Sequence, residues 1–154
     1  MTYEEYENLF AEQLKMPGVD VSVLPSLEAL NMARMTVKPR VFVIYNGSQF
    51  AEREELDVVA QAETLRFEVF IQAIKRSGAN GIFGVADEVN RRLLGFCPPD
   101  AHFPITFSEF GYVSGVQNGW QYALAFTFTA YKIEACRPEP EQVVTKVNFN
   151  TDTK

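Results

Sequence analysis

Hydrophobic and polar positions alternate most clearly in the stretch GWQYALAFTFTAY, residues 119–131. Successive side chains of a strand point to opposite faces, so the alternation predicts a strand. One of its faces is small and only weakly polar, formed by alanine, threonine and glutamine. The other face is bulky and carries Trp120, Tyr122, Leu124, Phe126 and Phe128. We expect the bulky face to pack against helices and the flat face to be free for a partner.

Three further segments have strand patterns. RVFVIYNG, from residue 40, is a nearly continuous apolar run that ends in Asn-Gly, which predicts a central strand followed by a polar loop or hairpin tip. Residues 62–76 also alternate: from Thr64 to Ala73 the apolar residues share one face, apart from Phe70 on the polar face. ITFSEFGYVSG, from residue 105, precedes the hairpin signal Asn118-Gly119. A two-residue turn there would place Glu109 opposite Phe128, so we expect a bulge near Gly111 or Gly115, or a longer loop.

Two segments have helical periodicity. The first, about residues 3–15, opens with Thr2 and Glu5 at capping-box spacing and stops before Pro17. The second, GIFGVADEVNRRLLG from residue 81, has an apolar stripe and Gly95 at the expected C-cap. SLEALNMAR, from residue 26, is a candidate for a short additional helix.

These elements predict an α+β fold in the order α-β-β-α-β-β. The expected architecture is a single four-stranded, mostly antiparallel sheet with two main helices packed on one face. We place one domain at residues 1–136, close to the common size of a single domain. Pro138 and Pro140 mark a boundary, so residues 137–154 are expected to be a C-terminal extension, either an added strand or a flexible arm.

Composition and charge argue against several classes of protein and of binding partner. The 154 residues carry 14 basic and 20 acidic side chains, a net charge of −6, which argues against binding nucleic acid or anionic lipid. No apolar run approaches the ~20 residues that a membrane helix needs. The acidic, amphipathic N-terminus does not resemble a signal peptide. Cys97 and Cys136 belong to no C-x-x-C pair, and we interpret both as reduced thiols in a cytosolic setting.

Catalytic signals are weak. His102 is the only histidine and lies near Asp100, but no nucleophile motif accompanies the pair. One histidine and two scattered cysteines do not form a zinc site. GANGIFG lacks the lysine and hydroxyl of a phosphate-binding loop, so a turn before a helix is the better interpretation. We therefore expect neither an enzyme nor a cofactor or metal.

Two groups of residues are instead candidates for protein interfaces. An acidic loop carries several carboxylates that can contact a basic partner. Two aromatic residues lie on the less apolar parity of their strand, where exposed rings can mark an assembly surface. The six candidate interface residues are Glu52, Glu54, Glu55, Asp57, Phe110 and Tyr112.

GIFGVADEVNRRLLGFCPP, followed by ITFSEFGYVSGVQNGWQYALAFTFTAY, resembles the small tail proteins of Mu-like phages. Members have a helix that ends near a Gly-aromatic step, then a Pro-containing loop, and a strand pair with the pattern W-x-Y-x-L-x-F. Here that pattern is Trp120, Tyr122, Leu124 and Phe126, and PRVFVIYNG matches the family's early strand. The likeness covers about residues 20–132, and the family is similar in topology to the tail terminator proteins of long-tailed phages.

The resemblance implies a structural protein of the virion tail, assembled in the cytoplasm of the bacterial host. Its partners would be other copies of itself, in a ring usually of six, together with the tail tube and the head or neck connector protein. The sheath protein is a further candidate partner. Such a ring ends tail polymerisation and presents a docking surface to the head. The alternatives are a head–tail connector of the same fold and, in another class, a small hydrolase or ligand-binding domain that uses Asp100 and His102.

Overall fold

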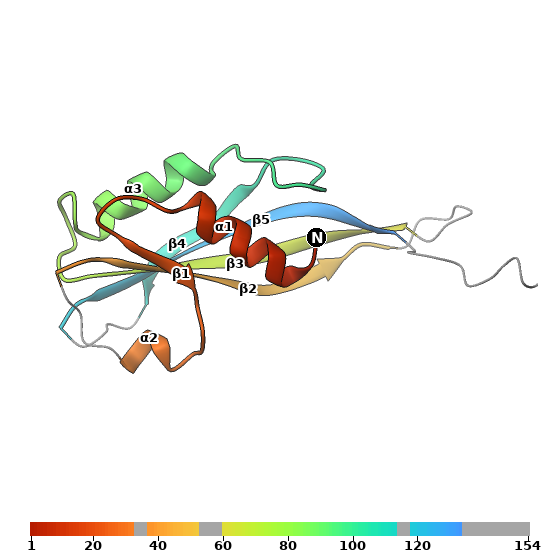
Figure 1. Cartoon of the computed structure of the whole chain (residues 1–154). Helices are drawn as coiled ribbons and strands as arrows, with labels where there is room; N and C mark the ends of the chain where they lie inside the picture. Colours follow the sequence, from red (N-terminus) through yellow and green to blue (C-terminus); the bar gives the residue numbers. More distant parts are fainter. Residues whose placement is uncertain (33–36, 53–59, 114–117, 134–154) are drawn as a thin grey trace, which may run out of the picture.

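The computed structural model describes residues 1–32, 37–52, 60–113 and 118–133 (Figure 1). These residues form one sheet with helices on both of its sides. The elements are α1 (Tyr3–Gln13), β1 (Asp20–Val23), α2 (Ala29–Met32), β2 (Arg40–Phe50), β3 (Ala60–Ala73), α3 (Ile82–Leu93), β4 (Thr106–Val113) and β5 (Trp120–Ile133).

The sheet has five strands in the order β1-β2-β3-β5-β4. β1 runs parallel to β2, and the β2–β3, β3–β5 and β4–β5 pairs are antiparallel. The prediction of a four-stranded, mostly antiparallel sheet is therefore wrong, because the sheet is mixed and has a fifth strand, although the α+β class remains. The predicted boundary after residue 136 lies outside the described residues.

The missed strand, β1, is four residues long, with the sequence Asp-Val-Ser-Val. It is too short to give a period-2 signal of its own, and Gly18 and Pro25 on either side of it are typical of a loop. Pairing in register with Arg40–Val43 of β2 is what makes it a strand. Tertiary pairing, rather than local pattern, decides this element.

β2 also differs from its prediction. It continues through the Asn46-Gly47 signal and pairs with β3 as far as Phe50. The register shifts between Tyr45 and Gly47, and Gly47 has φ +140°, which favours glycine. Asn-Gly therefore marks a β-bulge inside a long strand rather than the end of that strand.

The β4–β5 hairpin has the longer connection that we expected, because Val113 pairs with Gln121. It also has a bulge, but at Ser108 rather than at Gly111, since the register shifts between Phe107 and Glu109; Gly115 lies outside the described residues. Glu109 consequently pairs with Ala125, away from the buried aromatic face.

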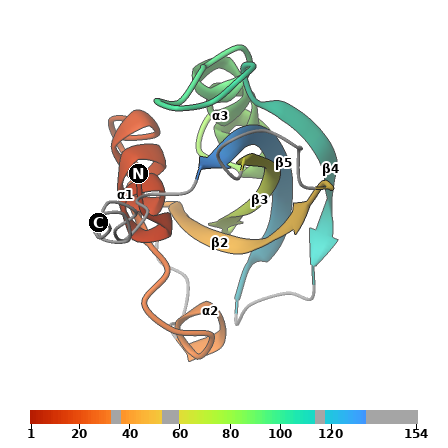
Figure 2. The same cartoon turned by 90° about the vertical axis from the view of Figure 1, so that its right-hand side faces the viewer.

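α1 and α3 pack on the same face of the sheet and enclose the core (Figure 2). The Thr2–Glu5 capping box is present at the start of α1, as predicted. Phe10 of α1 is fully buried and packs edge-to-face against Phe67 of β3 and Phe126 of β5. The predicted stripe of α3 is also buried and consists of Ile82, Val85, Ala86, Val89 and Leu93.

The opposite face of the sheet is partly covered by the chain itself. The short α2 lies on this side (Figure 2), where the amide nitrogen of Gln72 donates to the carbonyl oxygen of Leu30 at 2.9 Å and to Oε1 of Gln121 at 2.6 Å. Ala125 is buried on the same face, beside the bulge at Ser108. The alternation in the sequence predicted that the small face of β5 would be free for a partner. The chain itself instead covers part of this face.

Candidate functional site

The most prominent exposed feature is a group of aromatic rings at the end of the sheet where β4 and β5 join. We call it the aromatic cluster, and it comprises Arg76 with Phe83, Phe110, Tyr112, Trp120 and Tyr122. The ring of Tyr122 lies at its centre, 5.4 Å from Phe110, 5.7 Å from Tyr112 and 5.8 Å from Phe83. Trp120 completes the cluster through an edge-to-face contact with Tyr112 at 6.0 Å.

Arg76, from the loop between β3 and α3, joins the rings into one unit. Its guanidinium carbon lies 5.1 Å from the ring centres of both Phe83 and Trp120, and its Nε donates to the Tyr122 hydroxyl at 3.3 Å. The guanidinium cation thus lies against two aromatic faces, and these cation–π contacts stabilise its charge. Arginine, tyrosine and tryptophan are the residue types enriched where proteins bind one another.

The bulge at Ser108 places the β4 rings in this cluster. Without it, Phe107 and Phe110 would point to opposite faces, because they differ by an odd number of residues. The extra residue reverses the alternation, so that Phe107 pairs with Phe126 while Phe110 and Tyr112 pair with Leu124 and Tyr122. Phe110 and Tyr112 lie beyond the cover of the helices and are 42% and 58% exposed.

The two edges of the sheet differ in protection. The first edge is the short β1, which has four residues and pairs with β2 as far as Val43; beyond it, the Glu7 carboxylate of α1 accepts the N–H of Tyr45 at 2.8 Å. The other edge is β4, which has eight residues, and among the described residues no strand pairs with the outer side of either edge strand, so β4 is the longer open edge. An uncovered edge strand beside exposed rings is a surface on which another chain can pair or pack.

The predicted interface residues fall into two groups. Phe110 and Tyr112 belong to the aromatic cluster, although their role as interface residues stays a prediction. Of the acidic candidates, Glu52 is exposed just after β2. The remaining three, Glu54, Glu55 and Asp57, lie outside the described residues. The acidic cluster therefore stays a prediction.

A second polar group lies between α1 and the sheet. The Glu63 carboxylate of β3 is only 4% exposed and accepts hydrogen bonds of 2.7 Å from the hydroxyls of Tyr3 and Ser48. Lys132 places its Nζ 3.7 Å from the other oxygen, and Tyr45 stacks on Tyr3 with ring centres 4.3 Å apart. The hydrogen bond to Glu63 and the burial of the phenol raise the pKa of Tyr3. This arrangement binds the first turn of α1 to the sheet.

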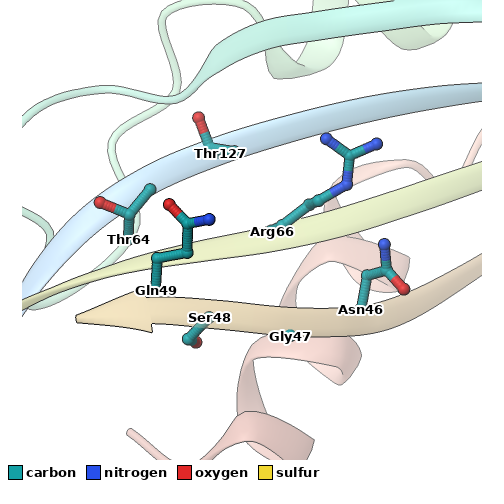
Figure 3. A pocket seen from close by; sticks show the side chains of 7 residues that line it. All are labelled: Asn46, Gly47, Ser48, Gln49, Thr64, Arg66 and Thr127. Atoms are coloured by element: carbon teal, nitrogen blue, oxygen red, sulfur yellow. The ribbon is translucent and has the colours of Figure 1, made fainter.

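A polar hollow of about 350 Å³ opens on the sheet face away from α1 and α3. Figure 3 shows the side chains of Asn46, Gln49, Thr64, Arg66 and Thr127 directed to one side of the strands, with Ser48 directed to the other. The Arg66 guanidinium donates to Glu109 at 3.0 Å, so its charge is already paired within the molecule. The hollow offers hydroxyls and amides for hydrogen bonding.

The residues considered for catalysis do not meet in the structure. The ring of His102 packs against Phe103 and Tyr131 with centres 4.6 and 5.4 Å apart, whereas the Asp100 carboxylate pairs with the amino group of Met1 at 3.1 Å. Cys97 is exposed and forms no disulfide within the described part of the chain. Within the described residues there is also no group of three or more histidine, cysteine, aspartate or glutamate side chains that could hold a metal ion.

The glycine-rich stretch before α3 is a turn leading into the helix, as interpreted from the sequence. The N–H groups of Ile82 and Phe83 donate to the carbonyl oxygens of Lys75 and Arg76, both at 2.9 Å. These are the groups that a phosphate at the helix start would need, and they are already satisfied.

Sequence patterns identified only part of the aromatic cluster. Arg76 and Phe83 come from a loop and a helix far from β4 in sequence, so no periodicity connects them. For the bulge itself, the spacing of Phe107 and Phe110 is a usable signal, because two large rings three residues apart in a strand share a face only across a bulge.

Comparison with known proteins identifies the family. The model of the Gp37 protein family matches residues 12–151, and the chain therefore belongs to this family of phage-associated proteins. The predicted link to a phage protein family is confirmed at that level. No curated protein matches the sequence. Within the described residues, none of the helices has the length and apolar character needed to cross a membrane.

Proposed function

We propose that this phage protein is a structural protein of the tail that assembles into a homo-oligomeric ring, most simply of six copies. The ring caps the tail tube, ends its polymerisation and presents the surface to which the head or neck docks. One observation carries the proposal: β4 is an eight-residue edge strand flanked by exposed rings, whereas the opposite edge is the four-residue β1, beyond which Glu7 of α1 accepts the N–H of Tyr45.

The asymmetry of the two edges favours a ring. When two different patches of each subunit meet head to tail, the contact repeats around an axis and closes once the rotation completes a circle. The aromatic cluster with the β4 edge provides one patch on every copy. Family membership supports a role in a phage, and the sequence resemblance to tail terminators supports the place in the tail.

Neither the Glu63 group nor the polar hollow is our candidate for the association surface. Glu63 is occupied in holding α1, and Arg66 in the hollow is occupied by Glu109, so both sites stabilise the fold. Glu52, at the exposed start of the acidic loop, remains our candidate for contact with the tube or neck.

The association surface can be tested with the purified protein. Replacing Phe110 and Tyr112 together by serine should weaken self-association by about tenfold or more, since exposed aromatic anchors dominate interface energies. Phe103→Ser is the matched control, because Phe103 is 64% exposed and lies outside the cluster. Sedimentation velocity over a concentration series measures the effect, and equal association of all three proteins would contradict the proposed surface.

The role in the tail needs a test in the phage. When the gene is inactivated, electron microscopy should show tails longer than normal and not joined to heads. The wild-type gene should restore normal length, and the Phe110→Ser, Tyr112→Ser variant should not. Tails of normal length that carry heads in the absence of the protein would eliminate the terminator role.

A further inference from the structure

The chain contains one short segment whose chemistry complements the aromatic cluster. Residues 137–141 have the sequence Arg-Pro-Glu-Pro-Glu and lie within the family match. We infer that this segment of one copy binds the aromatic cluster of the next copy. The inference rests on the proposed ring and names the second of the two patches that such a ring requires.

The two prolines suit the rings. Proline fixes its own φ near −65° and turns the residue before it away from helical conformations, so Arg137 and Glu139 as well as Pro138 and Pro140 favour an extended polyproline II backbone. A sequence with this preference loses little conformational entropy when it is bound. Grooves lined by aromatic rings are the surfaces that recognise such proline-containing segments.

The charges suit each other as well. Arg76 is exposed and lies over Phe83 and Trp120, and the neighbouring Lys75 is also exposed. Glu139 and Glu141 supply the opposite charge. In a chain with a net charge of −6, a cationic patch is where an acidic segment of another copy meets attraction rather than repulsion.

The dimensions of the molecule place this contact between copies. The two ends of β5 lie at opposite ends of the sheet (Figure 1). Tyr122 precedes Ile133 by eleven residues of the same strand, a distance of about 36 Å at the rise of a strand. Pro140, the more distant of the two prolines, follows Ile133 by seven residues, which span at most about 25 Å. The prolines therefore cannot reach the cluster of their own chain, and each copy both gives a segment and receives one.

A charge exchange tests the contact in the full-length protein. Arg76→Glu should weaken self-association by about tenfold, and so should Glu139→Arg combined with Glu141→Arg, because each places like charges together. Combining all three substitutions restores opposite charges and should return association close to that of the wild type. Lys15→Glu reverses an exposed cation outside the cluster and should leave association unchanged.

Sedimentation velocity gives the decisive comparison. If the wild-type protein associates and neither charge variant weakens it, the inferred contact is wrong while ring formation stands. Weakening without restoration in the combined variant also overturns the inference, because another segment or partner surface would then occupy the cluster.

A peptide experiment covers the case of a wild-type protein that stays single. Trp120 is the only tryptophan of the chain, so its emission reports on the cluster directly. A synthetic peptide of residues 137–145 should shift this emission saturably, and a peptide with alanine at both proline positions should bind more weakly. A saturable shift without self-association supports the contact and removes the ring, whereas no shift with either peptide overturns the inference.

Discussion

Gly84 shows how closely two backbone segments approach at the start of α3. A Cβ atom at this position would overlap the carbonyl oxygen of Gly78 and lie 2.8 Å from that of Ala79. Both contacts are with backbone, which cannot move aside as a flexible side chain can. Glycine is therefore required here by the packing of the loop onto the first turn of the helix, despite its poor helix propensity.

Gly84→Ala should consequently destabilise the protein by about 1–3 kcal/mol, the usual cost of overpacking. Gly111→Ala is the matched control, since a Cβ at Gly111 would meet nothing within 4 Å and should leave stability unchanged or slightly higher. Thermal unfolding at low protein concentration measures both variants. An equal melting temperature for Gly84→Ala and the wild type would show that the loop yields.

At the scale of elements, the chain was predictable where a pattern runs through several periods. α1, α3, β3 and β5 have eleven to fourteen residues each, and their buried faces follow the periodicity of the sequence. β1 was not predictable, because four residues become a strand only by pairing with β2. The bulges at Asn46 and Ser108 depend on cross-strand register in the same way.

The candidate site follows the same division. Phe110 and Tyr112 were recognisable as aromatic residues on the less apolar parity of their strand, so this part of the cluster could be proposed from sequence. Arg76 and Phe83 reach the cluster only because the β3–α3 loop folds over the end of β5. Contacts between elements that are distant in sequence leave no periodic trace in a single chain.

The attachment of α1 to the sheet through Tyr3 predicts a specific pH dependence. The pKa of the Tyr3 phenol is raised above its ordinary value of 10.0, first by the hydrogen bond to Glu63 and then by burial. Below pH 10 the phenol is protonated in both states, and the contact contributes fully. Above pH 10 the unfolded chain releases this proton while the folded protein keeps it, so the free energy of unfolding falls as the pH rises.

Tyr3→Phe should therefore lose less stability than the wild type between pH 10 and about pH 11.5, as measured by urea unfolding at each pH. Glu63→Gln should show the same shallower decline, because it removes the carboxylate that contributes most to the shift. Parallel declines in all three proteins would mean that Tyr3 does not hold its proton through Glu63.

At the scale of the whole molecule, the proposed ring predicts that stability depends on assembly. A ring in which each copy covers the cluster of its neighbour can form only from folded subunits. Association then stabilises the folded state by mass action, and the stabilisation grows with protein concentration. A monomer would instead show one melting temperature at every concentration.

Each tenfold increase in protein concentration above the dissociation constant raises the free energy of unfolding by about 1.4 kcal/mol through this linkage. For a chain of 154 residues, that corresponds to a rise in melting temperature of roughly 3–6 °C. The Phe110→Ser, Tyr112→Ser variant should lose this dependence while keeping the wild-type melting temperature at high dilution, because both side chains are exposed in the single subunit. A melting temperature that rises equally in both proteins would place the stabilising contact on another surface. A wild-type melting temperature that does not change with protein concentration would mean that the subunit folds and works alone.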